Sequence, residues 1–116
     1  MPYTIDGITI EGAHEPQLKG GTLWVPLRQI SEALGASVDW DTANRVAIVY
    51  VNSDMATLKI GDATVDWNGE QSELQAAPYV EEGEAWVPVR FFEQPLGYGL
   101  SVNLENSQVD FTTAVA

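Results

Sequence analysis

Cysteine is absent from the 116 residues, and histidine occurs once, as His14. Without cysteine the chain has no disulfide, no thiol nucleophile and no thiolate metal ligand. Transition-metal centres in proteins are built from several imidazole or thiolate ligands, so we expect His14 to be an ordinary surface residue. The sequence therefore predicts no metal site and no cofactor.

Basic residues and long hydrophobic runs are both scarce. Five lysines and arginines stand against 17 aspartates and glutamates, which gives a net charge of −12. Such a surface repels the phosphate backbone, so we expect no nucleic-acid partner. Anionic lipids and anionic wall polymers are disfavoured for the same reason unless divalent cations bridge them. No apolar stretch approaches the roughly twenty residues that span a bilayer, so no membrane insertion is expected.

Recognisable catalytic motifs are missing as well. The chain has no glycine-rich phosphate loop, no G-x-S-x-G nucleophile elbow and no HExxH zinc motif. The lone His14 leaves any serine without a recognisable triad. Asp39, Asp41 and Asn44 cluster around one turn, but turn chemistry explains them and their spacing does not match an EF-hand loop. We therefore predict that the protein is not an enzyme.

What the chain does contain is an internal repeat. The segment GTLWVPLR at residues 21–28 returns 62 residues later as GEAWVPVR at residues 83–90, and Leu34-Gly35 returns as Leu96-Gly97. Self-similarity at a fixed period indicates that one structural unit is used twice. Because no stretch resembles a linker, we predict one domain over residues 1–116 in which the two copies share a core.

The copies are expected to cover about residues 5–52 and 63–112. Towards the ends of the two copies, residues 45–48 match residues 108–111 if the alignment of the copies is shifted by one residue from the offset of 62. We predict an α+β fold of two pseudo-repeats, each a strand, a short helix and a β-hairpin, packed as one β-rich domain.

The helix of the first copy follows from its residue pattern. Pro26 suits the first position of a helix, where its missing N–H costs nothing. Leu27, Ile30 and Leu34 then form one apolar stripe, and Gly35 suits the left-handed position that ends a helix. The second copy repeats this plan, except that Pro95 is expected to distort or shorten its helix.

Paired strands are predicted around the helices. Asp6-Gly7, Gly61-Asp62 and Asn68-Gly69 each separate two β-favouring segments, which is typical of a hairpin turn. After each helix, further hairpins are expected over residues 37–50 and 100–112, the first closed by residues 41–44.

A long segment, WVPLRQISEALGASVDWD at residues 24–41, closely resembles the signature of the copper amine oxidase N-terminal-like domain, also called the stalk domain. Residues 86–92 and 96–97 resemble the same signature, and the resemblance covers roughly residues 5 to 112. The family is common in exported proteins of Gram-positive bacteria, where it accompanies wall hydrolases and surface-layer proteins. The resemblance implies a mixed α+β fold and an extracellular or cell-wall location. It does not imply copper, because the oxidase site needs three imidazoles and a tyrosine-derived quinone.

The first five residues have neither the basic nor the apolar region of a signal peptide. Either the protein stays inside the cell, or the sequence is a piece of a longer exported chain that begins with a new methionine. The residues leave open whether Met1 is native.

Structural roles are assigned to four positions that hold the same residue in both copies, which are eight residues in all. They are Trp24, Pro26, Arg28 and Gly35 in the first copy and Trp86, Pro88, Arg90 and Gly97 in the second. Each arginine is expected to fasten the structure by contacting an aromatic ring, a carboxylate or strand-end carbonyls. The alternative is that the arginines form an anion or carboxylate clamp in a groove between the copies.

Four other aromatic residues are candidates for a ligand platform, because aromatic faces stack on sugar rings. These are Trp40, Trp67, Tyr79 and Tyr98. The leading functional hypothesis is a non-catalytic binding or spacer module of the cell envelope. As a binding module it would hold peptidoglycan or another wall glycan. The alternative is a structural module that self-associates, as a homo-oligomer, or supports a neighbouring domain of a longer exported protein. Phe91, which replaces the polar Gln29 of the first copy, favours such a contact unless it is buried locally.

Overall fold

The computed structural model describes residues 3–11, 14–81, 83–93, 96–103, 105 and 108–113. In the first half of the chain the strands are β1 (Tyr3–Ile5), β2 (Ile8–Thr9), β3 (Gln17–Lys19), β4 (Thr22–Pro26), β5 (Ser37–Asp41), β6 (Val46–Val51) and β7 (Asp54–Lys59). In the second half they are β8 (Thr64–Trp67), β9 (Glu70–Glu73), β10 (Tyr79–Glu81), β11 (Glu84–Pro88), β12 (Gly99–Asn103) and β13 (Gln108–Thr112). The helical elements in this part of the chain are α1 (Leu27–Ala33) and the 3₁₀-helix η1 (Val89–Phe92).

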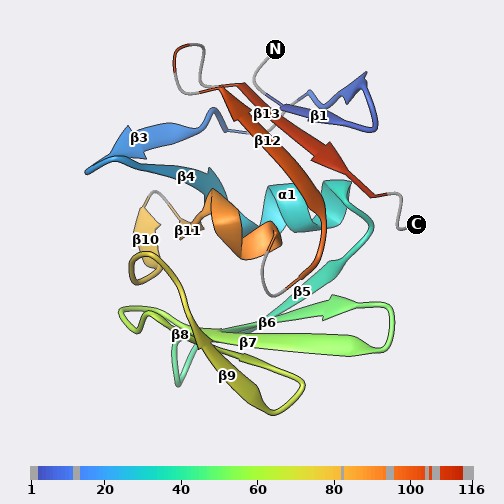
Figure 1. The fold of residues 1–116 in the computed structure, drawn as a ribbon. Helices are drawn as coiled ribbons and strands as arrows, with labels where there is room; N and C mark the ends of the chain where they lie inside the picture. Colours follow the sequence, from blue (N-terminus) through green and yellow to red (C-terminus); the bar gives the residue numbers. More distant parts are fainter. Residues whose placement is uncertain are drawn as a thin grey trace.

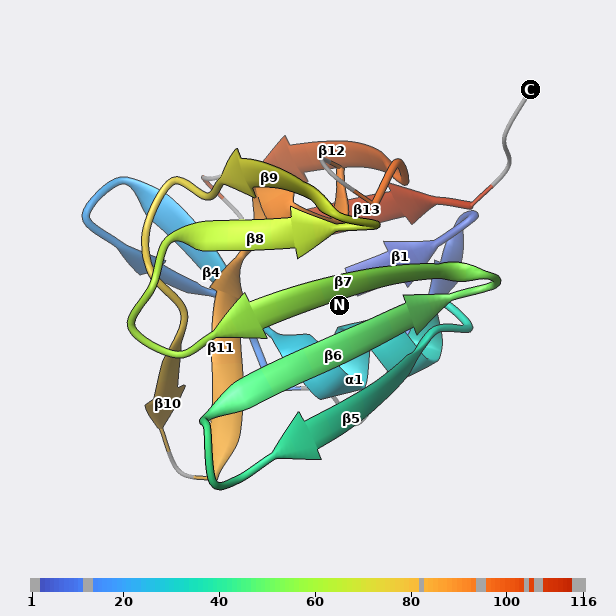
Figure 2. The same cartoon turned by 90° about the horizontal axis from the view of Figure 1, so that it is seen from below.

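The strands form three sheets with the orders β12-β13-β1-β2, β10-β11-β4-β3 and β5-β6-β7-β8-β9. In Figure 1, α1 lies above the five-stranded sheet and below β1 and β13, and Figure 2 shows it behind β5 and β6. The N-terminal strand β1 pairs in parallel with the C-terminal strand β13, so the two ends of the chain meet in one sheet. The fold is therefore closed by a contact between the first and last strands.

The predicted hairpins are confirmed. Asp6 and Asn68 adopt φ of 52° and 53°, and each is followed by a glycine with positive φ, as a two-residue hairpin turn requires. The strands β7 and β8 flank Gly61-Asp62, and the hairpins β5–β6 and β12–β13 follow the two helical segments. Alternating buried and exposed residues in these strands match the pattern from which they were predicted.

The repeat extends further in three dimensions than in the sequence. Strands β3, β4 and β5 return as β10, β11 and β12 at an offset of 62 residues and with unchanged lengths. The predicted one-residue slip is wrong, because Asp41 pairs with Val46 just as Asn103 pairs with Gln108. Both hairpins therefore close after the same number of residues.

The two copies meet where β4 pairs antiparallel with β11. In this ladder Trp24 lies opposite Pro88, Val25 opposite Val87, and Pro26 opposite Trp86. Val25 pairs with its own counterpart, and Trp24 and Pro26 each pair with the counterpart of the other. A local twofold axis therefore passes between the two strands. Repeat positions that looked separate in the sequence are thus in direct contact.

The predicted α+β class is wrong, because the described residues form a mostly β fold with one α-helix. The helix of the first copy is present as α1, but Pro26 ends β4 with an extended conformation and α1 begins only at Leu27. The second copy has the four-residue η1 in place of an α-helix. Pro95, which was predicted to distort this segment, lies outside the described residues.

A physical reason for the missing second helix lies in its side chains. Phe91 and Phe92 are both fully buried and their rings meet edge to face, with centroids 5.2 Å apart. Two adjacent residues of an α-helix point about 100° apart, so burying both requires an unusually wide apolar face. Valine and phenylalanine are also weaker helix formers than the leucine and glutamine at the matching positions of α1.

Candidate binding groove

An apolar groove of about 380 Å³ lies between the two copies. Its residues are Leu27, Arg28, Val38, Trp40, Val80, Gly83, Glu84 and Ala85. The first copy contributes the start of α1 and strand β5, and the second copy contributes the hairpin β10–β11. Because β5 and β10 are the outer strands of two different sheets, the groove separates two sheet edges.

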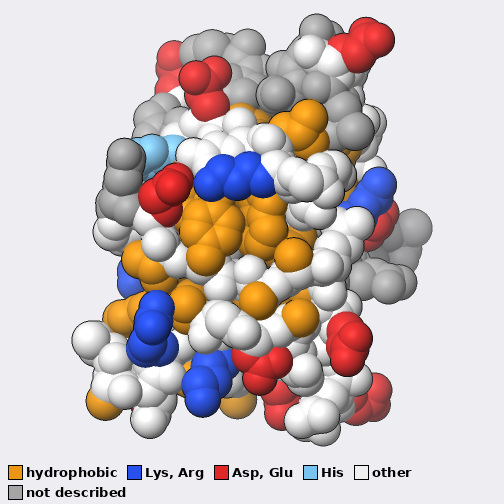
Figure 3. Space-filling model, turned by 90° about the vertical axis from the view of Figure 1, so that its left-hand side faces the viewer, with side chains coloured by type: hydrophobic (Ala, Val, Ile, Leu, Met, Phe, Trp, Pro, Cys, Tyr) orange, Lys and Arg blue, Asp and Glu red, His pale blue; other side chains and the backbone are white. Residues whose placement is uncertain are grey.

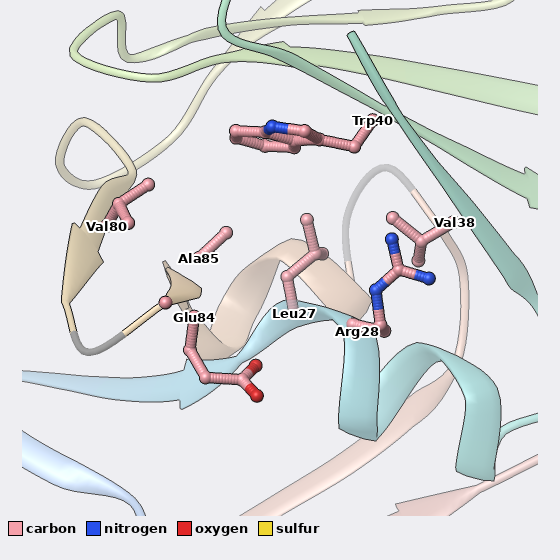
Figure 4. Close-up of a pocket in the computed structure, with 8 residues that line it drawn as sticks. Leu27, Arg28, Val38, Trp40, Val80, Glu84 and Ala85 are labelled. Carbon is pink, nitrogen blue, oxygen red and sulfur yellow. The ribbon is translucent and has the colours of Figure 1, made fainter. Parts of the chain in front are cut away.

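Trp40 forms one wall of this groove. Across the sheet it lies in one row with Ala47, Leu58 and Val65, which are almost completely buried. At the open end of this row the indole keeps 37% of its surface exposed. In Figure 4 the indole lies across the groove from Val80, Ala85 and Leu27. The indole therefore presents one free face towards an apolar wall.

The charged residues that line the groove in the described part of the chain are Arg28 and Glu84, and Arg28 is already paired. The Arg28 guanidinium lies 3.5 Å from the Glu32 carboxylate one turn along α1, and both side chains are about half exposed. In Figure 4 the guanidinium lies beside Val38 and the Glu84 carboxylate points away from the indole. The groove is therefore mainly apolar, with a paired cation at its side and a carboxylate that points away from the indole.

A smaller groove of about 180 Å³ lies near Arg90, lined by Gly21, Leu23, Gln75, Val89, Arg90 and Val102. Apart from Gln75, these residues are the counterparts, 62 residues away, of Gly83, Ala85, Leu27, Arg28 and Trp40. The fold thus builds the same groove twice. Leu23 stands where the larger groove has Ala85 and takes up more space, and Val102 stands where it has Trp40, so the described lining of the second groove has no aromatic wall.

The arginines at the matching helix starts make matching contacts. Arg90 donates to the Glu93 carboxylate at 3.0 Å, and Arg28 pairs with Glu32. Pairing with a carboxylate was one of the structural roles expected from the sequence. Each arginine also lines a groove between the copies, which is where the alternative hypothesis placed a clamp.

The four candidate platform residues do not come together. Trp67 and Tyr98 are partly buried and pack against the hydrophobic core, and burial raises the pKa of the Tyr98 hydroxyl. Tyr79 lies among other aromatic rings on the sheet that contains β10 and β11. Of the four, the groove contains Trp40 alone. Its apolar partners Val80 and Ala85 were missed, although a comparison of the repeats would have singled out the pair of Trp40 and Val102.

Trp24 and Trp86 are buried, with 6% and 3% of their surfaces exposed. Tyr79 lies between them, edge-on to Trp24 with centroids 4.8 Å apart and stacked on Trp86 with centroids 6.5 Å apart. Neither indole N–H has a hydrogen-bond partner among the described residues. We call these three residues the aromatic cluster, and it packs on the face of the sheet opposite to the main core.

The aromatic cluster is covered by a basic side chain. The Lys19 ammonium lies 4.8 Å from the centre of the Tyr79 ring and 3.7 Å from the Glu81 carboxylate. The Tyr79 hydroxyl also donates to the Gln17 side chain at 3.2 Å. Figure 3 shows hydrophobic side chains gathered beneath a basic one on this face of the molecule. The contacts join β3 of the first copy to β10 of the second and so hold the hairpin that carries Val80.

The remaining candidates have ordinary structural contacts. His14 is exposed, and its carbonyl accepts a hydrogen bond of 2.7 Å from the buried Tyr3. Both carboxylate oxygens of Asp41 accept hydrogen bonds from Asn44, which closes the turn as predicted and lowers the pKa of the Asp41 carboxyl. No group of three or more potential metal ligands occurs within the described ranges. With one histidine and no cysteine, the donor set does not fit a copper centre.

In the described part of the chain, no helix has the length and apolar character needed to cross a bilayer. A family model described as the copper amine oxidase N-terminal domain matches residues 4–111. A curated relative from Brevibacillus choshinensis, named a protease inhibitor, is 30% identical over 94 residues, or 77% of this chain. The chain spans only 29% of that relative's length, so the comparison extends to one part of a larger protein.

Proposed function

Since the chain belongs to the copper amine oxidase N-terminal domain family, we propose that it is a non-catalytic module of an exported protein that binds cell-wall glycan in the Trp40 groove. The family is that of an N-terminal domain, which supports an accessory role beside another part of a longer chain. An extracellular or wall-associated location is part of the same proposal.

One observation supports the proposal above the others: the repeated architecture does not require the indole of Trp40. The second copy forms the equivalent strand and the equivalent groove with Val102 at this position. By contrast, both copies have a tryptophan at the equivalent position of Trp24 and Trp86, and both of these side chains are buried. A partly exposed aromatic side chain that the fold can do without is available to bind a ligand, and aromatic rings combine a large apolar face with good packing.

The charge of the protein supports a neutral ligand. At a net charge of −12 the surface repels polyanions, and the groove has an apolar lining beside a cation that is already paired. A glycan strand without charged groups meets both conditions. The ring C–H face of a pyranose can stack on the indole, and its hydroxyls can reach the polar rim of the groove.

Co-sedimentation with purified peptidoglycan sacculi tests this function. The protein should be retained saturably in a salt series from low to high ionic strength, because retention by stacking depends little on screening. Trp40→Val, which copies the residue of the second repeat, should abolish retention. Tyr50→Val is the matched control, because Tyr50 is 36% exposed and its neighbour Val49 is buried, so it points to the opposite face of the sheet.

Absence of retention, with and without Ca²⁺, would refute glycan binding and leave the alternative of a spacer or self-associating module. Phe91 cannot provide the contact surface for that alternative, because its side chain is fully buried. Sedimentation equilibrium over a concentration series would then measure self-association directly.

A further inference from the structure

Within the proposed glycan function, on which this inference rests, we infer that the Trp40 groove selects N-acetylated sugars over unsubstituted and deacetylated ones. The argument begins with the two walls of the groove. Trp40 presents an aromatic face, and Leu27, Val80 and Ala85 present an aliphatic wall across from it. Both walls are apolar, so an occupant must offer apolar surface on two sides.

An unsubstituted hexose leaves part of the aliphatic wall uncovered. In a β-linked glucose unit the hydroxyls are equatorial, so one C–H face can stack on the Trp40 indole while the hydroxyls project from the rim of the ring. The ring itself therefore extends no apolar group towards Val80 and Ala85. An acetamido group replaces one of these hydroxyls with an arm that ends in a methyl group. Placing this methyl group against Val80 and Ala85 removes apolar surface from water on both sides of the sugar.

The apolar wall of the groove distinguishes the acetylated sugar from its deacetylated form. Deacetylation converts the acetamide into an amine that is protonated near neutral pH. An ammonium in this position would lose its hydration against the apolar side chains of Val80 and Ala85, and the Glu84 carboxylate, which points away from the indole, is not placed to pair with it. The net charge of −12 attracts cationic oligosaccharides to the surface in general. Stronger binding of the neutral form would therefore reflect the groove and not the overall field of the protein.

The second groove has a larger side chain at one of the matching positions and no aromatic ring at another. At the positions of Ala85 and Trp40 it has Leu23 and Val102, and its volume is about 180 Å³ instead of about 380 Å³. Ala85→Leu thus fills part of the wide groove, and Trp40→Val removes its aromatic wall. Both substitutions use residues that the same architecture already accepts at the equivalent positions.

The experiment is isothermal titration of the 116-residue chain with three tetrasaccharides: N-acetylglucosamine tetramer, its fully deacetylated form and cellotetraose. The acetylated tetramer should bind about tenfold more tightly than either of the others, a difference of about 1.4 kcal/mol. Ala85→Leu and Trp40→Val should each remove the preference, and Tyr50→Val should preserve it.

Equal affinity for the acetylated tetramer and cellotetraose would overturn the inference and leave the proposed glycan function standing. Tighter binding of the deacetylated tetramer that weakens steeply with salt would also overturn it, because it would mean non-specific attraction of a cation. No binding of any tetramer overturns the inference as well. In that case, retention on sacculi decides separately whether the proposed function survives.

Discussion

Val25 and Val87 lie opposite each other at the centre of the antiparallel pair β4–β11, and each is the counterpart of the other in the repeat. Both side chains are fully buried. Equivalent residues that face each other across an antiparallel ladder define a local twofold axis. The copies are therefore joined through like surfaces, as the subunits of a symmetric dimer are. The two grooves between the copies are a direct consequence of this arrangement.

Shortening the side chain of Val25 or Val87 at this axis should strongly destabilise the protein. Val25→Ala and Val87→Ala each remove two buried methyl groups and leave a cavity, so each should lower the free energy of unfolding by about 2–3 kcal/mol. Because the two sites are in contact, the double variant should deviate from the sum of the single effects. Urea denaturation measures all three. Val80→Ala is the control, because Val80 is 43% exposed and should change stability by less than about 0.5 kcal/mol. Similar losses in the control and in the axis variants would contradict this account of the interface.

The tryptophans should separate into structural and dispensable residues. Trp86→Ala should cost about 3–5 kcal/mol, because the indole is buried against Tyr79. Trp40→Val should cost no more than about 1.5 kcal/mol, because the indole is partly exposed and valine occupies the equivalent position of the second copy. Chemical denaturation followed by circular dichroism tests both variants. A Trp40→Val variant that unfolds as readily as Trp86→Ala would make Trp40 a core residue and remove the main support for the groove as a binding site.

At two positions glycine should be required because of the backbone conformation and not because of limited space. Gly35 and Gly97 follow the two helical segments with φ of +89° and +88°, and an added Cβ would meet no atom within 4 Å at either position. Alanine at either position should therefore cost about 1–2 kcal/mol through strain and not through a clash. Asparagine, which tolerates the left-handed region better, should cost less. Thermal unfolding of the four variants would reveal this order, and equal losses for alanine and asparagine would point to a different cause.

The closure between the first and last strands should weaken in acid. The Asp110 carboxylate accepts hydrogen bonds from Thr4 at 2.6 Å and from Gln108 at 2.9 Å, and these bonds lower its pKa. A hydrogen bond from the Thr113 hydroxyl and another from the Thr113 backbone N–H lower the pKa of Asp6.

A carboxyl whose pKa is lower in the folded state contributes stability above its unfolded pKa of about 3.9, and this contribution is lost as pH falls through the folded pKa. Stability should therefore decline as pH falls below about 4. Asp110→Asn should flatten this decline, which urea titrations between about pH 2.5 and pH 6 would detect. Parallel pH profiles for the variant and the parent protein would show that Asp110 does not contribute.

The paired arginines should contribute little to stability. Arg28 and Arg90 form ion pairs within their own helical segments, and the side chains involved are 42–56% exposed. Exposed pairs of this kind are typically worth about 0.3–0.5 kcal/mol, so Arg28→Gln and Arg90→Gln should each change the free energy of unfolding by no more than that. A loss above about 1.5 kcal/mol from either variant would instead make its arginine a main fastening between the copies.

The sequence by itself determined the elements that depend on local chemistry. Asp6-Gly7 and Asn68-Gly69 specify tight turns because few residues accept positive φ, and the stripe of Leu27, Ile30 and Leu34 specifies α1. The internal repeat and the family were also visible, because a long motif that occurs twice in register does not require a structure to be recognised.

Only the tertiary structure decided what depends on packing between distant segments. The second helix did not form as an α-helix, because Phe91 and Phe92 both find places in the core. The sequence likewise contains no signal that brings Trp40 to Val80 and Ala85, which are 40 and 45 residues away. Their meeting follows from the twofold pairing of β4 with β11, and such pairing is chosen by the burial of whole sheet faces and not by any local motif.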